Sequence, residues 1–574
     1  MRSVLVMFPM LLACASQGLG AVRPAAPEDG PLAREVDALF AEWSGPNSPG
    51  GGVIVVDGGE VVLRRCHGLA DVEHGAPITP ATRFELASVS KPFTGFAVLL
   101  LEEEGRLSLD DPIQKHLPEL PDYGAPVTVA DLLHHTSGLS DWVDVLPYAG
   151  RDIRVGFDID DLIDLVARQR VLEFTPGSKW SYSNTNYALL AEIAARATGR
   201  PFGEWMAEHV FAPLGMDDTS IPANGACVLP RRAQAYRRGP DGERTRSLVE
   251  HFEIPGPAHA FSTLDDMALW ADNLCTGRVG GRDLLERMFA KPLLDTGERS
   301  FSGGGVGVFE FRGARTVGHS GQTGGFKSEL LVCPDLGVGI VVLANDRSAP
   351  AADIAHRVLG LYLGDRLAPP AEAAAEAAGA AADEEPAPFI DMDPADWTPF
   401  LGGYRLAADP SVLVAVVREG DWLVGALVGE GLDFFRPVSP AVFENRNRNC
   451  RVAFVEDGGA VARAEIVLNG HAMTARRVAL PDDASWRDGF AGFYHSDELR
   501  CAWQIVGEGG GLAVRRVGGE DRSLHPADRD VLAGGIGILT FRRDGDGRIT
   551  GFDFSEPEDL GQRRIRFTRH DARD

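Results

Sequence analysis

Lysine is scarce in this chain of 574 residues. Of its 56 basic residues only five are lysines, so arginine carries most of the positive charge. Arginine keeps its proton in any protein environment, whereas a lysine shielded from water can lose its charge and act as a base. Proton transfer by an amine therefore has to involve one of these few side chains. The lysines are Lys91, Lys115, Lys179, Lys291 and Lys327.

Cysteine is also uncommon. The seven cysteines form no C-x-x-C pair, and no H-E-x-x-H motif occurs. These absences exclude the common zinc-binding patterns and argue against a dense disulfide framework. The stretch Asp544-Gly545-Asp546-Gly547 lacks the remaining ligands of a calcium loop and is typical of a hairpin turn. The residues therefore support no metal site.

An excess of positive charge is missing as well. The chain has 83 acidic and 56 basic residues, which gives a formal net charge of -27. This balance excludes the basic surface of a typical nucleic-acid-binding protein. The acidic residues are scattered along the chain, a distribution typical of a solvated surface.

The apolar run at the N-terminus, from Val4 to Ala15, is too short to span a membrane. Arg2 precedes it and small residues follow as far as Ala21, which is typical of a secretory signal peptide over residues 1–21. Residues 11–14 also resemble a bacterial lipobox, in which Cys14 would carry a lipid. We therefore expect an exported protein, periplasmic or extracellular, and leave open whether it is a lipoprotein or has a plain cleavable signal.

One lysine lies one helical turn after a serine, in Ser88-Val89-Ser90-Lys91, the only Ser-x-x-Lys of the chain. Pro92 and apolar residues at three- and four-residue spacing follow, which predicts a helix over 89–104. Residues at i and i+3 share a helix face, so the Lys91 amine can reach the Ser88 hydroxyl. A desolvated amine in this position can activate the hydroxyl as a nucleophile. The alternative is a helix-capping serine beside a solvated lysine.

A second motif, Tyr182-Ser183-Asn184, follows a Pro-Gly turn and precedes a predicted amphipathic helix over 187–197. A phenol near a lysine can relay a proton, and a side-chain amide can orient a substrate carbonyl. By itself, Tyr-x-Asn is more typical of ordinary turn chemistry.

A third motif, Gly318-His319-Ser320-Gly321-Gln322, lies in a glycine-rich stretch ahead of two predicted strands, 330–332 and 337–344. His319 could donate to a bound acyl group and a following amide could complete an oxyanion hole, or His319 could be structural. The motif also nearly matches the G-x-S-x-G nucleophile elbow, but Gln322 replaces the last glycine and a strand follows instead of a helix. We therefore do not expect Ser320 to be a nucleophile.

The three motifs, in this order, resemble the serine β-lactamase and penicillin-binding protein superfamily. They are most similar to its branch of class C β-lactamases, D-alanyl-D-alanine carboxypeptidases, D-aminopeptidases and carboxylesterases. The resemblance extends over roughly residues 32–365. It includes further matching stretches at 52–58, 105–112, 131–139 and 213–216.

The resemblance implies that Ser88 attacks an ester, amide or lactam carbonyl and forms an acyl-enzyme that water hydrolyses, without a cofactor. Lys91 and Tyr182 would share the transfer of the Ser88 proton to the leaving group. The backbone amides of Ser88 and Gln322 would hold the oxyanion, where losing one donor costs about 10² to 10³ in rate. The substrate-binding residues would be Asn184, His319, Gly321 and Gln322.

His319 departs from the pattern, because β-lactamases usually have lysine at this place. A neutral imidazole is a poorer counter-ion for a carboxylate than a permanent cation. We therefore expect a serine hydrolase of peptides, amides or esters that contain D-amino acids. The alternatives are a carboxylesterase or weak β-lactamase of the same superfamily, and a penicillin-binding sensor with little turnover.

The predicted fold class is α+β. Strands near 52–67 and 305–344 should form one antiparallel sheet, covered by helices 89–104 and 352–363, while residues 108–300 read as mainly helical. No large apolar residue occurs in the Ala-, Glu- and Pro-rich stretch from Ala368 to Pro388, which predicts a linker over 366–388.

The chain beyond the linker has short alternating strands and a weak internal repeat. Phe400-Leu401-Gly402-Gly403-Tyr404 corresponds to Phe490-Ala491-Gly492-Phe493-Tyr494. Two antiparallel β-barrels, at 389–483 and 484–574, satisfy both the length and the pattern. This layout is similar to that of D-aminopeptidases, in which two lipocalin-like barrels follow the β-lactamase-like domain.

Overall fold

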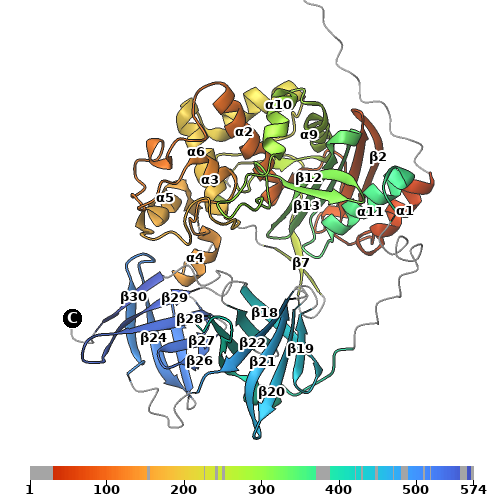
Figure 1. The fold of residues 1–574 in the computed structure, drawn as a ribbon. Coiled ribbons are helices and arrows are strands. Elements are labelled where there is room, and N and C mark those ends of the chain that lie inside the picture. Colours follow the sequence, from red (N-terminus) through yellow and green to blue (C-terminus); the bar gives the residue numbers. More distant parts are fainter. Residues whose placement is uncertain are drawn as a thin grey trace, which may run out of the picture.

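A computed structural model shows the arrangement of the chain (Figure 1). The predicted signal peptide at 1–21, with Cys14, and most of the predicted linker lie outside the residues that the structure describes. The described residues are 30–151, 156–224, 227–239, 243–247, 252–369, 388–410, 412–419, 422–427, 431–445, 450–468, 471–479, 489–508, 511–517, 519–534, 536–555 and 565–570.

A six-stranded antiparallel sheet forms the centre of the N-terminal part, in the order β11-β12-β13-β14-β1-β2. As predicted, strands near 52–67 pair with strands near 305–344, and Val53 of β1 lies opposite Val342 of β14. The strands are β1 (Gly51–Asp57), β2 (Glu60–His67), β11 (Gly307–Phe311), β12 (Ala314–Thr323), β13 (Phe326–Cys333) and β14 (Val338–Ala344).

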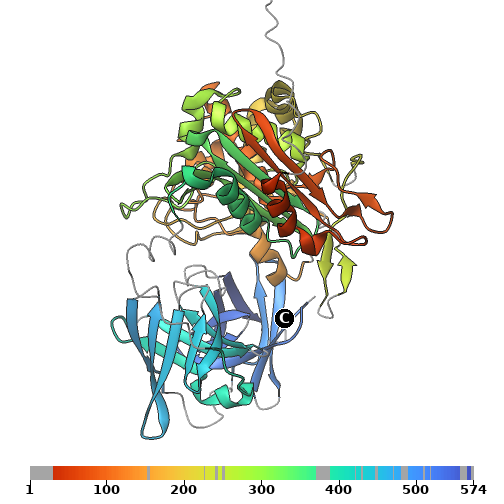
Figure 2. The same cartoon turned by 90° about the vertical axis from the view of Figure 1, so that its right-hand side faces the viewer.

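Helices cover both faces of this sheet because β1 is apolar on both sides. Val53 and Val55 join a core cluster with α1 and α11, whereas Ile54 and Val56 join the large cluster that includes α2 and α9. Figure 2 shows α1 and α11 lying across one face of the sheet. These helices are α1 (Pro31–Leu39), α2 (Lys91–Glu103), α9 (Leu264–Thr276) and α11 (Ala351–Leu363).

The segment between β2 and β11 is mainly helical, as predicted. The helix predicted over 89–104 begins as the 3-10 turn η2 (Ala87–Ser90) and continues as α2, and the helix predicted from 187 begins three residues earlier, at Asn184. Among the described residues, no helix is both long and apolar enough to cross a membrane. The remaining α-helices are α3 (Val129–Leu133), α4 (Trp142–Tyr148), α5 (Ile159–Arg168), α6 (Asn184–Thr198), α7 (Phe202–Met206), α8 (Ala212–Leu214) and α10 (Gly281–Phe289).

Short strands brace the helical region and its border with the sheet. They pair as β3 with β4, β5 with β10, β6 with β9 and β7 with β8. Their bounds are β3 (Leu69–Asp71), β4 (Ala76–Pro77), β5 (Phe84–Glu85), β6 (Phe157–Asp158), β7 (Tyr236–Arg238), β8 (Arg244–Arg246), β9 (Phe252–Glu253) and β10 (Phe261–Ser262).

Two closed antiparallel barrels follow, as predicted, with strands β15 to β22 in the first and β23 to β30 in the second. Closure pairs β15 with β22 and β23 with β30, which leaves no open sheet edge. The first barrel contains β15 (Gly402–Leu406), β16 (Leu413–Glu419), β17 (Trp422–Leu427), β18 (Gly431–Ser439), β19 (Val442–Asn445), β20 (Cys450–Asp457), β21 (Ala460–Leu468) and β22 (His471–Arg477). The second contains β23 (Gly492–Ser496), β24 (Cys501–Glu508), β25 (Gly511–Arg516), β26 (Arg522–Asp528), β27 (Val531–Gly534), β28 (Gly537–Arg543), β29 (Ile549–Ser555) and β30 (Ile565–His570).

The internal repeat marks the same position in both barrels. The buried Tyr404 hydroxyl donates to the Phe400 carbonyl at 2.7 Å, and the buried Tyr494 hydroxyl donates to the Phe490 carbonyl at 2.7 Å. In each barrel this tyrosine lies on the first strand, and its hydroxyl gives a hydrogen-bond partner to a carbonyl that would otherwise be buried without one, just before that strand. The repeat visible in the sequence is thus a structural device of each barrel.

The two barrels lie side by side below the N-terminal part (Figures 1 and 2). They contact one another through a small apolar cluster that includes Val417 and Ala527, beside an ion pair between Arg405 and Asp528. The second barrel meets the helical region at α4, and its core is continuous with the large cluster of the N-terminal part.

Candidate active site

Ser88 lies in the 3-10 turn η2, directly before α2. The preceding residue, Ala87, is buried and has φ 49°. This left-handed backbone conformation is unfavourable for any residue that carries a side chain. Such strain persists where the surrounding packing holds the turn. Here the turn presents a half-buried serine hydroxyl at the start of a long helix.

Lys91 is fully buried, and its Nζ has three oxygen neighbours. Nζ lies 2.8 Å from Asn184 Oδ1, 3.0 Å from the Pro257 carbonyl and 3.2 Å from Ser88 Oγ. Burial lowers the pKa of Lys91 to about 7. A neutral amine has two hydrogens and one lone pair, so donation to Asn184 and Pro257 leaves the lone pair for the Ser88 proton.

Tyr182 is the second group on the nucleophile, with its hydroxyl 3.0 Å from Ser88 Oγ. Its ring stacks on the buried His135 at a centroid distance of 4.7 Å and lies 4.7 Å from Lys91 Nζ. Burial raises the pKa of Tyr182 above its ordinary value. Tyr182 is therefore protonated at neutral pH and can donate a proton to a leaving group.

Asn184 is the first residue of α6 and connects Lys91 to a carboxylate that sequence reasoning missed. Its backbone N–H and its Nδ2 donate to Asp141 Oδ2 at 2.9 and 2.7 Å. Asp141 is buried and precedes α4, where it accepts from the Val143 N–H. The sequence signal was only that of a helix-capping aspartate, which is common and carries no indication of a catalytic neighbourhood.

His319 lies on β12, with its ring centroid 6.0 Å from that of Tyr182. Burial, with Lys91 nearby, lowers the pKa of His319 to about 4, so the imidazole is neutral. Its Nδ1 lies 2.6 Å from the Ser320 carbonyl, which can only accept a hydrogen bond. The proton therefore sits on Nδ1, and Nε2 is left as an acceptor.

Gly321 brings β12 against the turn that holds Ser88. A Cβ at this position would lie 2.4 Å from the Leu86 carbonyl oxygen and 3.2 Å from Ala87 Cβ. Only glycine allows this approach, which sets the backbone at Gln322 beside Ser88. Both Gln322 and Ser88 line a cavity of about 490 Å³, which extends over the sheet edge toward Glu329 and the start of α11.

Ser320 is exposed on β12, and the chain continues through a turn into β13. A strand, not a helix, follows the motif, so the nucleophile-elbow geometry is absent from this described segment. The prediction that set Ser320 aside as a nucleophile is consistent with this topology.

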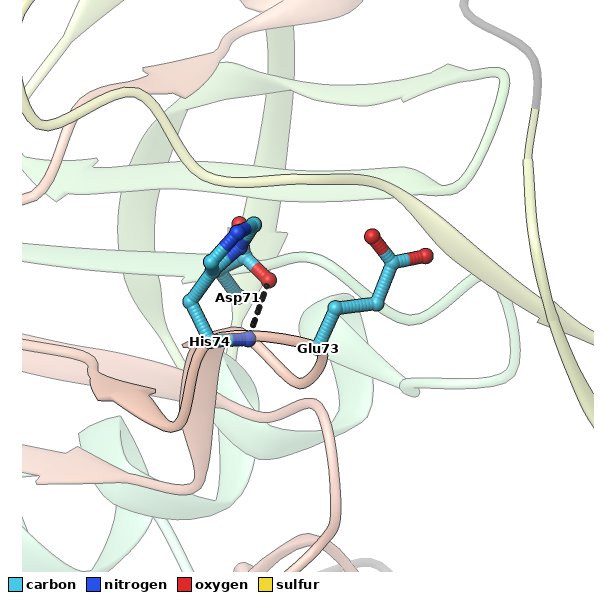
Figure 3. A group of neighbouring side chains, drawn as sticks. All are labelled: Asp71, Glu73 and His74. Carbon is cyan, nitrogen blue, oxygen red and sulfur yellow. Dashed lines mark hydrogen bonds and ion pairs between the residues drawn. The ribbon is translucent and has the colours of Figure 1, made fainter.

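One group of side chains in the described part of the chain is spaced to hold a cation: Asp71, Glu73 and His74 (Figure 3). It lies at the end of β3 and in the turn that leads to β4. His74 Nδ1 is already paired with Asp71 at 2.8 Å, Asp71 is half-buried, and Glu73 and His74 are exposed. None of the three lines the cavity beside Ser88. Among the described residues, no two cysteines are joined by a disulfide bond.

Residues 36–363 match the family model described as Beta-lactamase. The chain belongs to the beta-lactamase family. With Ser88 held between an amine and a phenol, it is a serine hydrolase of this family.

Relatives extend the match beyond the family domain. A D-aminopeptidase of Brucella canis is 28% identical over 534 residues, which cover 90% of this chain and 95% of the relative. The octameric penicillin-binding protein homologue from Pyrococcus abyssi superimposes with a TM-score of 0.52 at 21% identity, over 78% of this chain and 99% of that one. The D-amino acid amidase from Ochrobactrum anthropi SV3, complexed with L-phenylalanine amide, gives a TM-score of 0.50 at 24% identity, over 59% and 100%. At these identities, the two solved structures are evidence of the fold.

The structure brings the predicted site residues of this beta-lactamase family member together. Ser88, Lys91, Tyr182 and Asn184 form one hydrogen-bonded group, and His319 lies beside Tyr182. Their individual catalytic roles stay predictions. The neighbours that sequence reasoning missed are His135, Asp141 and Pro257.

The pH dependence tests the assignment of the base. Lys91 has to be neutral to take the Ser88 proton, so we expect kcat/KM to rise with pH through about 7. The rate should then stay level toward higher pH, because the pKa of Tyr182 is raised. An acid limb near 4, without one near 7, would instead assign the essential base to His319.

Proposed function

We propose that the protein hydrolyses amides and short peptides of D-amino acids through an acyl-enzyme on Ser88. The observation that carries the proposal is the Lys91 amine, held by two carbonyl oxygens so that its lone pair faces the serine hydroxyl. The substrate class is supported by the D-aminopeptidase relative, whose similarity covers 90% of this chain and so includes residues of both barrels.

Acylation follows from the contacts of Ser88. Its Oγ attacks the amide carbon while its proton passes to Lys91 Nζ, 3.2 Å away. As the C–N bond breaks, the leaving nitrogen takes a proton from the Tyr182 hydroxyl, 3.0 Å from Oγ. Lys91 then returns its proton to Tyr182, so the net transfer is from Ser88 to the amine product.

The oxyanion of this step would be held by the backbone amides of Ser88 and Gln322, as the resemblance to the superfamily implies. The close approach of Gly321 to the turn before Ser88 supports this arrangement, because it places both backbones at one cavity. In deacylation, water attacks the ester carbon and gives a proton to the Lys91 and Tyr182 pair. Ser88 Oγ leaves and regains a proton from the same pair.

The neutral state of His319 favours substrates that have no carboxylate at this end of the site. A neutral imidazole whose Nδ1–H is donated to the Ser320 carbonyl offers Nε2 as an acceptor and no positive charge. An acceptor suits an ammonium or amide N–H of the substrate. A β-lactam carboxylate would lack the charge-assisted bond that a lysine supplies, a contribution of about 1.5–3 kcal/mol.

We also propose that residues 1–21 are a signal peptide, that the protein acts outside the cytoplasm, and that Cys14 is a candidate lipid attachment site. The unit boundaries we propose are 32–365, 389–483 and 484–574, with the linker at 366–388. The Ala-, Glu- and Pro-rich composition of the linker supports the first boundary.

A substrate panel tests the proposed function. We expect the purified protein to hydrolyse D-alanine p-nitroanilide and D-amino-acid amides, and to discriminate against the L-enantiomers. A short p-nitrophenyl ester should also be cleaved, since esters are easier acyl donors, while a chromogenic cephalosporin should react slowly. The measurement is kcat/KM for each compound, with Ser88→Ala as the blank.

His319→Lys is the matched variant for substrate class. It restores a cation at the place where β-lactamases carry one, so we expect relative activity to move by about ten-fold or more toward D-Ala-D-Ala peptides and the cephalosporin. Turnover of the ester and cephalosporin but of no D-amide would favour an esterase or weak β-lactamase. No turnover and no labelling of Ser88 by a fluorophosphonate would contradict the hydrolase proposal.

A further inference from the structure

The N-terminal end of the short helix α4 lies in the active site. Asp141 precedes this helix, and its Oδ1 accepts from the Val143 N–H at 3.1 Å, as in an ordinary helix cap. The other oxygen, Oδ2, accepts from both the backbone N–H and Nδ2 of Asn184. One buried carboxylate thus joins the start of α4 to the start of α6.

This contact decides which way the Asn184 amide points. With Nδ2 donated to Asp141, the amide oxygen faces Lys91 Nζ at 2.8 Å. A flipped amide would set its N–H groups against the amine and its oxygen against the carboxylate, which loses both hydrogen bonds. Asp141 therefore keeps Asn184 in the orientation that holds one hydrogen of Lys91 away from Ser88.

Figure 1 shows α4 beside the second barrel, and it is the C-terminal end of the helix that contacts the barrel. The last carbonyls of a helix have no partner within the helix. Here the Tyr148 carbonyl accepts from Trp503 Nε1 at 3.0 Å and the Pro147 carbonyl accepts from Arg516 Nη1 at 3.4 Å. The Tyr148 ring also packs on Phe554 at a centroid distance of 4.9 Å. The N–H of Gly150 also donates to the Pro147 carbonyl, so barrel side chains and the following backbone together cap the C-terminal end of the helix whose N-terminal cap lies in the active site.

We propose that the second barrel is a structural part of the active site: it fixes α4, and with it Asp141, a positioning residue that orients Asn184 toward Lys91. The inference rests on the proposed acyl transfer at Ser88. In this role the second barrel acts on catalysis indirectly, through α4 and Asp141.

Asp141 also acts on Lys91 through its charge. Burial lowers the pKa of Lys91, and the Asp141 carboxylate opposes this effect. The two histidines near Lys91 have lowered pKa values and are neutral, and the tyrosines are protonated, so Asp141 is the neighbour whose charge acts on Lys91. Burial raises the pKa of Asp141 too, and hydrogen bonds from Asn184 and Val143 together with the charge of Lys91 oppose that rise. The titratable groups around Lys91 are His135, Asp141, Tyr182, Tyr187 and His319.

Two substitutions at Asp141 separate its hydrogen bonds from its charge. Asp141→Asn can still accept from Asn184 but is neutral, so we expect the acid limb of kcat/KM to move down by about one pH unit with a small loss of kcat. Asp141→Ala removes the hydrogen bonds and the charge. The same shift of the acid limb should then come with a loss in kcat of about 10- to 100-fold, the size of effect seen when a residue that orients a directly acting group is removed. A purely structural defect would lower the active fraction without moving the limb.

The barrel side is tested in the full-length chain by Trp503→Phe, which removes the indole N–H donated to Tyr148. We expect a lower kcat and an acid limb moved in the same direction as for Asp141→Asn. Trp397→Phe is the matched control, because Trp397 is buried in the first barrel and its Nε1 has no partner in the described part of the chain. If Trp503→Phe fails to fold, Arg516→Met removes the donor to Pro147 from the barrel surface and replaces it in the test.

Three results decide the inference. An unchanged pH profile and kcat in Asp141→Ala would overturn the role of Asp141, and a Trp503→Phe profile identical to that of Trp397→Phe would overturn the role of the barrel. The rate of fluorophosphonate labelling at Ser88 is measured alongside, since it depends on serine activation and not on substrate choice. An unlabelled wild type would defeat the proposed function itself, whereas a labelled wild type with unaffected variants would defeat only this inference.

Discussion

Lys91→Arg should abolish most of the activity although it keeps the positive charge. The guanidinium cannot release a proton at any accessible pH, so it cannot take one from Ser88. Removing a general base typically costs about 10² to 10⁴ in rate, and kcat/KM for a D-amide should fall within that range. The measurement is steady-state turnover together with the rate of fluorophosphonate labelling at Ser88.

The controls address the burial of Lys91, which leaves little space for the larger arginine. Lys91→Met is neutral and of similar length, so it should fold and be as inactive as the arginine variant. Lys115→Arg changes an exposed lysine that pairs with Asp111 and should keep wild-type rates. Activity in both Lys91 variants at more than a tenth of the wild-type level would eliminate Lys91 as the base.

Gly321→Ala should have the second largest effect, although it adds only one methyl group. The new Cβ would lie 2.2 Å from Ser328 Oγ and 2.4 Å from the Leu86 carbonyl oxygen, which Ser328 Oγ already donates to. The strand β12 has to move away from the turn that holds Ser88. A displacement of about 1 Å can cost about 100-fold in rate, because the oxyanion donors no longer meet the reacting carbonyl.

The loss should fall on kcat, with a smaller effect on stability from overpacking of about 1–3 kcal/mol. Thermal unfolding separates the two contributions. Gly360→Ala is the matched control in the same part of the chain, since its Cβ would meet only Arg312 Nη1 at 3.6 Å. A Gly321→Ala variant with wild-type kcat would mean that the approach of β12 to the turn is not needed for catalysis.

The helices and strands that position the site were predictable where their patterns are local. The spacing of apolar residues after Ser88 predicts the helix that begins there, and the two barrels follow from the repeat around Tyr404 and Tyr494. Helix ends were less predictable: α6 begins at Asn184, ahead of the apolar stripe, because its first turn is fixed by Asp141 and Lys91 instead of by its own pattern.

Residues that act through a third residue were not predictable. Asp141 is a helix cap by its local sequence, and Pro257 contributes only a backbone carbonyl to Lys91. Neither has a motif, because their function arises from contacts over 43 and 166 residues of sequence separation. The same holds for the junction with the barrel, where a carbonyl of α4 meets an indole 355 residues away.

The sequence by itself determined which side chains can perform acyl transfer here: a serine and a lysine one helical turn apart in a chain with only five lysines. Chemistry of this kind depends on residue type and short spacing, both of which are written locally. Only the tertiary structure decided the state of that lysine, because burial, the carbonyls around it and the carboxylate behind Asn184 come from distant segments. A pKa depends on everything packed around the group, and packing exists only once the chain has folded.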